Sequence, residues 1–169
     1  MRFYEHIVIG LAANAALFWF LSKTGFFSFT FFQNTTLAAA MLFAIALFSI
    51  LPDVDSINSF ASKLFRLVLL FVALASVIEF VYGKSVFALG KAVLAALVFV
   101  GHFLYAKSGR MHRQFPHTFT FGILACLAAF LLTWSKTIAL ASAIAFASHL
   151  IADGHFFNAL KRDFSFFKK

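Results

Sequence analysis

The stretch His112-Arg113-Gln114-Phe115-Pro116-His117 is the most polar run in an otherwise strongly apolar chain of 169 residues. It separates two long apolar segments, at about Val86–Tyr105 and about Thr118–Trp134. Pro116 has no backbone N–H and its ring clashes with the preceding turn, so a continuous helix cannot run through it. We therefore predict a bend between two helices here, with an imidazole on either side of the proline. Taken alone, the stretch is equally typical of a basic loop beside a membrane.

The composition of the whole chain indicates an integral membrane protein. Hydrophobic residues make up 63% of it and charged residues 12%, with a mean hydropathy of +0.95. A soluble domain has roughly 45–50% apolar and about 25% charged residues, so this chain cannot cover itself with a water-exposed surface. The net charge of +8 comes from bases scattered between apolar runs. In a membrane protein, such an excess of positive charge sets the orientation in the membrane and attracts anionic lipid headgroups. We therefore expect membrane lipids and no nucleic acid as partners.

Six apolar stretches predict an all-α fold, a single-domain bundle of about six transmembrane helices. Long unbroken apolar runs indicate helices, because barrel strands would alternate in polarity. Each stretch has about 15–20 residues, at or slightly below the roughly 20 that cross a 30 Å hydrocarbon layer. The first is expected to be a retained span, since no persuasive signal-peptide cleavage site follows it. The mixed basic and aromatic tail over 161–169 suits a membrane interface. The predicted spans are Ile7–Leu21, Leu37–Leu51, Leu64–Tyr82, Val86–Tyr105, Thr118–Trp134 and Thr137–Asp153.

Lys and Arg residues predict the orientation. With six spans, both termini share one side with the loops after the second and fourth spans, and that side holds ten of the 14 bases. Positive charge favours the cytoplasmic side. We therefore expect an inner, cytoplasmic membrane protein with both termini in the cytoplasm.

The ionisable residues gather at the same membrane face. All six histidines and five of the six acids fall there, and only Glu79 does not. Membrane insertion does not require this, because Lys and Arg set orientation. Ionisable groups at the ends of spans are candidates for function.

The spacing of these residues permits metal binding. His149 and Asp153 are four apart and project from one face of a helix, and Asp53-x-Asp55 follows the second span beside a proline. Imidazole and carboxylate ligands without thiolates suit Zn²⁺, Mn²⁺ or Fe²⁺. Two other interpretations stay open: a solvated turn at the aspartates, and a hydrogen-bonded helix-end pair at His149 and Asp153. His102 and His155 have no ligand-spaced partner in the sequence.

Three ordered motifs and an early histidine carry a resemblance to a known family. The sequence contains a His before the first span, then Leu51-Pro52-Asp53-Val54-Asp55, His112-Arg113-x-x-Pro116-His117-Thr118, and Ser148-His149-Leu150-x-x-Asp153. This resembles the LexA-regulated, membrane-bound, metal-dependent hydrolases of bacteria and archaea. That family is distantly similar to zinc-dependent phospholipase C and single-strand nucleases, which hold several zinc ions on clustered His and Asp.

The resemblance implies a ligand set and shows two departures. Ser56 stands where the family usually has His, which removes one ligand or weakens one metal site. Pro116 stands where Thr is usual, which alters the bend without removing an imidazole. The implied metal ligands are His6, Asp53, Asp55, His112, His117, His149 and Asp153.

These observations predict a metal-dependent hydrolase, with Zn²⁺ favoured, acting on a phosphoester of a lipid at the cytoplasmic face. Asp55 or Asp153 could act as general base instead of ligand, and Arg113 could assist the developing charge. The site would be ringed by Arg110, Arg113, Lys63 and Arg66, which attract phosphate headgroups. The alternatives are a transporter or metal-binding membrane protein without catalysis, and a scaffold whose histidines line a polar cap.

Overall fold

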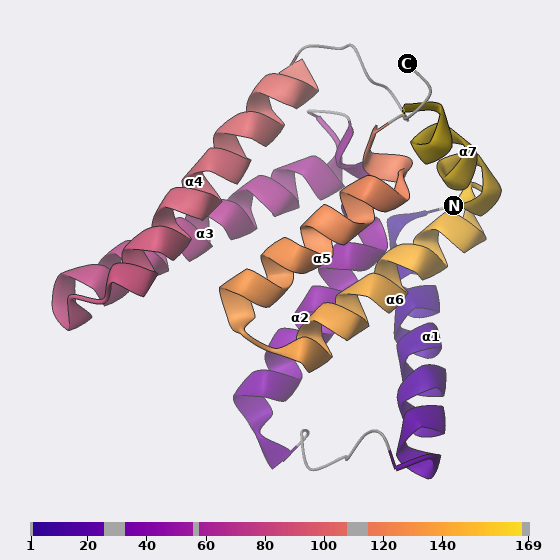
Figure 1. The fold of residues 1–169 in the computed structure, drawn as a ribbon, viewed down its shortest axis with the longest axis horizontal. Coiled ribbons are helices and arrows are strands. Elements are labelled where there is room, and N and C mark those ends of the chain that lie inside the picture. Colours follow the sequence, from indigo (N-terminus) through magenta and orange to yellow (C-terminus); the bar gives the residue numbers. More distant parts are fainter. Residues whose placement is uncertain (1, 26–32, 56–57, 108–114, 167–169) are drawn as a thin grey trace. The chain divides into compact units, whose positions relative to one another are not determined.

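The structure, a computed structural model, describes residues 2–25, 33–55, 58–107 and 115–166, and these form helices and no β-strand (Figure 1). The all-α fold predicted from the unbroken apolar runs is confirmed. The helices are α1 (Phe3–Lys23), α2 (Thr35–Ile50), α3 (Phe60–Gly83), α4 (Val86–Lys107), α5 (Phe119–Thr133), α6 (Lys136–Ala152) and α7 (Phe156–Phe166), with short 3-10 helices η2 (Leu51–Asp55) and η3 (Phe115–His117).

Six of these helices are the predicted apolar segments, and four are long and apolar enough to cross a membrane. The four are Phe3–Lys23, Thr35–Val54, Phe60–Gly83 and Val86–Tyr105. The other two, α5 and α6, have 15 and 17 residues. At 1.5 Å per residue α5 is about 23 Å long, less than the roughly 30 Å hydrocarbon layer. The chain is therefore an all-α membrane protein whose apolar helices differ in length.

Side-chain caps explain where several helices begin. The side chain of Asn34 accepts a hydrogen bond from the backbone N–H of Leu37 at the start of α2. Ser59 does the same for α3, which starts four residues before the predicted span. Ser135 caps α6 by accepting from Ile138. Each cap satisfies one N–H that the first helical turn leaves without a partner.

The chain divides into two compact units, of which the first comprises residues 1–52 and 114–169. Its central helix is α6, which packs against α1, α2 and α5 (Figure 1). Ala141 and Ala145 of α6 are fully buried, and their small side chains let the neighbouring helices approach closely. Gly10 of α1 is needed for the same reason, because a Cβ there would collide with the hydroxyl of Ser49 on α2.

The second unit comprises residues 53–113 and is built on a hairpin of α3 and α4. Three small residues of α4 are buried: Ala88, Ala92 and Ala95. Near the turn, Lys91 Nζ lies 2.6 Å from Glu79 Oε2, which joins the two helices. His102 Nε2 lies 3.1 Å from the carbonyl oxygen of Val54 in η2, so this imidazole holds the end of η2 on α4.

Helix α7 was not predicted, because the sequence analysis described residues 161–169 only as a basic and aromatic tail that suits a membrane interface. Residues 161–166 continue an amphipathic helix that begins at Phe156. Ala159 is fully buried and Lys161 is exposed, as expected for a helix with one packed and one solvated face. Asp163 holds α7 on α5, because its carboxylate accepts from the backbone N–H of Phe119 at 2.8 Å and from the hydroxyl of Thr120 at 2.7 Å.

Candidate metal centre

Three helix ends of the first unit carry the polar side chains of the candidate site. His6 lies in the first turns of α1, His149 and Asp153 lie at the end of α6, and His117 ends η3 just before α5. All three imidazoles are buried, at 1%, 0% and 4% exposure. Buried ionisable groups are costly unless they are paired or bind metal, so this concentration requires an explanation.

The carboxylate of Asp153 connects two of the imidazoles. Oδ1 lies 3.4 Å from His6 Nε2, and Oδ2 lies 3.2 Å from His149 Nε2. Two ligands on a tetrahedral Zn²⁺, with bonds of about 2.0–2.1 Å, are about 3.3–3.4 Å apart. The spacing of these nitrogen and oxygen atoms therefore suits two edges of a metal coordination sphere.

The tautomer of His149 is fixed by a hydrogen bond from its second ring nitrogen, Nδ1. Nδ1 lies 2.6 Å from the carbonyl oxygen of Ser49, which can only accept, so Nδ1 carries the hydrogen. In the neutral ring, Nε2 then presents a lone pair towards Asp153. Two acceptors at 3.2 Å repel each other unless a proton or a cation lies between them. A metal-ligating histidine usually donates its other N–H in this way.

His6 stacks on His149 and limits the charge that the cluster can hold. Their ring centroids are 4.0 Å apart with an interplanar angle of 24°. Two protonated rings at this distance would repel each other. Within the described part of the chain, Nδ1 of His6 has no hydrogen-bond partner. At least one of the two imidazoles is thus best accommodated as a neutral ligand or donor.

His117 brings a third imidazole to the same place. One ligand atom each from His117, His149 and Asp153 lie within 4.8 Å of one another. The ring of His117 also meets His149 edge-on, with centroids 5.8 Å apart. The Thr118 hydroxyl donates to the carbonyl oxygen of Phe115 at 2.7 Å and accepts from the N–H of Phe121 at 3.1 Å, so it fastens η3 to α5 and fixes the position of His117.

His155 also lies in this cluster, although sequence spacing gave it no partner. Its ring contacts that of His117 edge-on, with centroids 5.4 Å apart. Gly154 adopts φ +68° after the end of α6, and His155 N–H donates to the Leu150 carbonyl at 2.8 Å. This is a Schellman turn, which folds the chain back over the helix end. An Asp-Gly pair closing an apolar helix was the signal that could have placed His155 here.

The remaining predicted site residues belong to the second unit, and several lie outside the described residues. Asp53 belongs to η2 and is half-buried, and its carbonyl accepts from the Ser59 hydroxyl at 3.0 Å. Asp55 ends η2, and the structure describes its backbone alone. His112 and Arg113 lie outside the described residues, as does Ser56. The assignment of all seven predicted residues as ligands stays a prediction.

The sequence was compared with known families, curated proteins and solved structures. A family described as the YdjM inner membrane protein matches residues 1–158. The chain belongs to the YdjM inner membrane protein family. The comparisons with curated proteins and with solved structures found no match.

Membership in the YdjM family agrees with the apolar helices and supports a membrane location. The match begins before His6 and ends after His155, so it spans the described site residues. It supports the membrane part of the resemblance noted above and leaves regulation by LexA and similarity to phospholipase C as expectations.

Proposed function

We propose that this protein is a membrane-embedded, metal-dependent hydrolase that acts on a phosphoester, most simply that of a lipid. The observation that carries the proposal is the Asp153 carboxylate between His6 and His149, with separations of 3.4 and 3.2 Å. The hydrogen bond from His149 Nδ1 to Ser49 leaves Nε2 as the ligand atom. Three buried imidazoles around one carboxylate are unusual in the packing of an ordinary protein core and are common in a metal site.

His6, His117, His149 and Asp153 would hold the metal. Nitrogen and oxygen ligands without thiolate favour Zn²⁺, with Mn²⁺ and Fe²⁺ as the other candidates. We also propose Asp53, Asp55 and His112 as ligands, on the grounds of the sequence motifs that contain them. A bound Zn²⁺ lowers the pKa of water towards 7 and so supplies a nucleophile at neutral pH.

The protein's own groups would then orient and neutralise the substrate. Because the imidazoles are buried, water is largely excluded around them, and charge on a phosphoryl group would interact strongly with the site. Whichever of Asp55 and Asp153 does not bind the metal would accept a proton as general base, and Arg113 would neutralise charge developing on the phosphoryl oxygens. The excess of Lys and Arg on the side of the membrane predicted to hold both termini predicts that the site faces the cytoplasm.

Metal analysis of the purified protein tests the proposal. We expect His149→Ala and Asp153→Ala each to lower bound metal per folded protein, and activity on a panel of phospholipids and soluble phosphoesters to fall with it. Glu79→Ala is the control, because Glu79 pairs with Lys91 Nζ at 2.6 Å in the second unit and is not a proposed ligand. It should lose stability and keep its metal.

Two outcomes would contradict the proposal. If both variants keep the wild-type metal content and only lose about 1–3 kcal/mol of stability, the pair is a structural helix-end contact. If metal is bound and lost as expected while no phosphoester is hydrolysed, the protein is a metal-binding membrane protein without this activity.

A further inference from the structure

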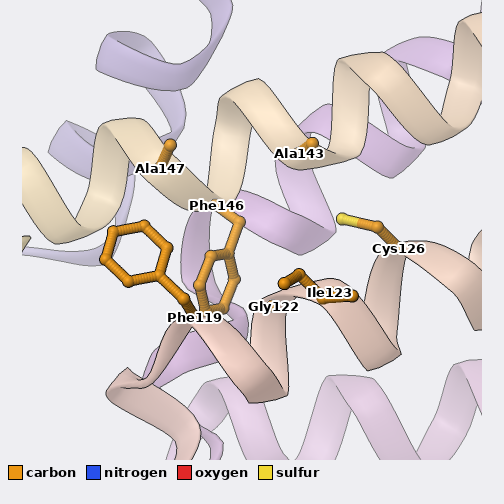
Figure 2. Close-up of a pocket in the computed structure, with 7 residues that line it drawn as sticks. All are labelled: Phe119, Gly122, Ile123, Cys126, Ala143, Phe146 and Ala147. Atoms are coloured by element: carbon orange, nitrogen blue, oxygen red, sulfur yellow. The ribbon is translucent and has the colours of Figure 1, made fainter. Parts of the chain in front are cut away.

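An apolar groove of about 220 Å³ lies between α5 and α6 in the first unit (Figure 2). Ile123 and Cys126 of α5 line one side, and Ala143 and Ala147 of α6 line the other. Phe146 closes the groove, with its ring against the backbone of α5 at Gly122. A Cβ at that glycine would come within 2.5 Å of the ring. The groove thus exists because small residues face each other across the two helices.

The groove is open and contains almost no polar surface. Ile123 is 67% exposed, and Ala143 is also exposed. Because α5 and α6 are apolar helices of a membrane protein, we expect hydrocarbon around them. An apolar cavity without polar partners does not hold ordered water. The occupant that fits this chemistry is an acyl chain.

One end of the groove lies next to the candidate metal centre. Phe119 lines that end and is two residues from His117, and Phe146 lies one helical turn before His149. The Phe119 ring also packs edge-on against Phe156 of α7, with centroids 5.1 Å apart. A chain lying in the groove therefore has its polar end at the level of the clustered imidazoles.

We propose that this groove binds an acyl chain of a phosphate-bearing lipid whose headgroup lies at the cluster. The hydrolysis of that headgroup rests on the proposed function, whereas binding of the acyl chain does not. It makes a membrane lipid the substrate, and a soluble phosphoester at most a poor one. Binding of the chain would place the scissile phosphoester relative to the metal ligands, which is how binding energy remote from the reacting atoms contributes to rate.

Native mass spectrometry of the full chain in detergent can test the groove without relying on catalysis. The probes are dioleoyl phosphatidic acid, which has phosphate and chains, dioleoylglycerol, which has chains alone, and glycerol 3-phosphate, which has phosphate alone. Wild-type protein should bind phosphatidic acid tightest. Ala143→Leu extends a side chain into the groove and should weaken phosphatidic acid and dioleoylglycerol binding by about tenfold or more. Glycerol 3-phosphate binding and metal content should not change.

The matched control is Ala139→Leu, which makes the same change one turn earlier on α6 at a residue outside the groove lining. Cys126→Phe fills the groove from α5 and should repeat the effect of Ala143→Leu, so that misfolding of one variant cannot decide the result. Equal phosphatidic acid affinity in wild type and in the folded filling variants would overturn the groove proposal. Loss of lipid binding in the filling variants, in a protein that proves to hold no metal, would support the groove and refute the proposed function.

Discussion

The contact between α7 and α5 gives a prediction whose size follows from the structure. The Asp163 carboxylate accepts from the N–H groups of Phe119 and Thr120 at 2.8 and 3.4 Å, and from the Thr120 hydroxyl at 2.7 Å. Losing a capping side chain costs about 0.5–2 kcal/mol, and a hydrogen bond to a charged group contributes about 1.5–3 kcal/mol. Thr118 continues to cap α5, and water can replace a half-buried carboxylate. We therefore expect Asp163→Ala to cost about 1–2 kcal/mol.

Thermal unfolding in mild detergent measures this cost, with a thiol-reactive dye reporting the exposure of Cys126, the single cysteine of the chain. At about 2–4 °C per kcal/mol, the Tm should fall by about 2–8 °C. Asp163→Asn keeps one acceptor oxygen and should lose about half as much. Asn158→Ala alters an exposed residue of the same helix and serves as control. A Tm for Asp163→Ala equal to that of Asn158→Ala would refute the docking of α7 through Asp163.

Two further predictions concern orientation and close packing. A reporter fused to the C-terminus should show a cytoplasmic location, because the six-span prediction places ten of the 14 Lys and Arg residues on the side of the termini; an external signal would reverse the assignment. Gly10→Ala should lower the Tm by forcing a Cβ against the Ser49 hydroxyl, at a cost of about 1–3 kcal/mol, and adding Ser49→Ala should recover most of it. Gly90→Ala is the control, since a Cβ there meets open space, and equal Tm values for the Gly10 and Gly90 variants would contradict the close approach of α1 and α2.

Helix content followed from the sequence because the apolar runs are long and their caps are strong. Asn34 and Ser59 begin helices where their side chains can accept a backbone hydrogen bond. Pro116 lies in a 3-10 turn between α4 and α5, in agreement with the predicted bend. The helix boundaries at α1 and α3 were placed too late, because the prediction began each span at the first continuous apolar residue. The polar residues before that point already satisfy the first helical turn.

Helix α7 and the position of His155 could not be predicted by counting apolar runs. In α7, aromatic and basic residues alternate at short range, and only the helical period separates the packed Ala159 from the exposed Lys161. The place of His155 depends on the left-handed conformation of Gly154, which turns the chain back after α6. A motif search compares spacings along one helix, and it cannot detect an imidazole brought in by a turn.

The close packing of helices explains why the polar cluster can exist in so apolar a chain. Gly10 lies one turn after His6, and its missing side chain lets α1 approach Ser49 of α2. The carbonyl of that same Ser49 accepts from His149 of α6, which stacks on His6. One small residue thus permits the contact between α1 and α2, and the contact sets the distance between imidazoles from α1 and α6. Ligand atoms must be placed within a few tenths of an ångström for a metal to bind well. The proposed metal site would therefore depend on the residues beneath the cluster as much as on the histidines, and Gly10 and Ser49 belong to it.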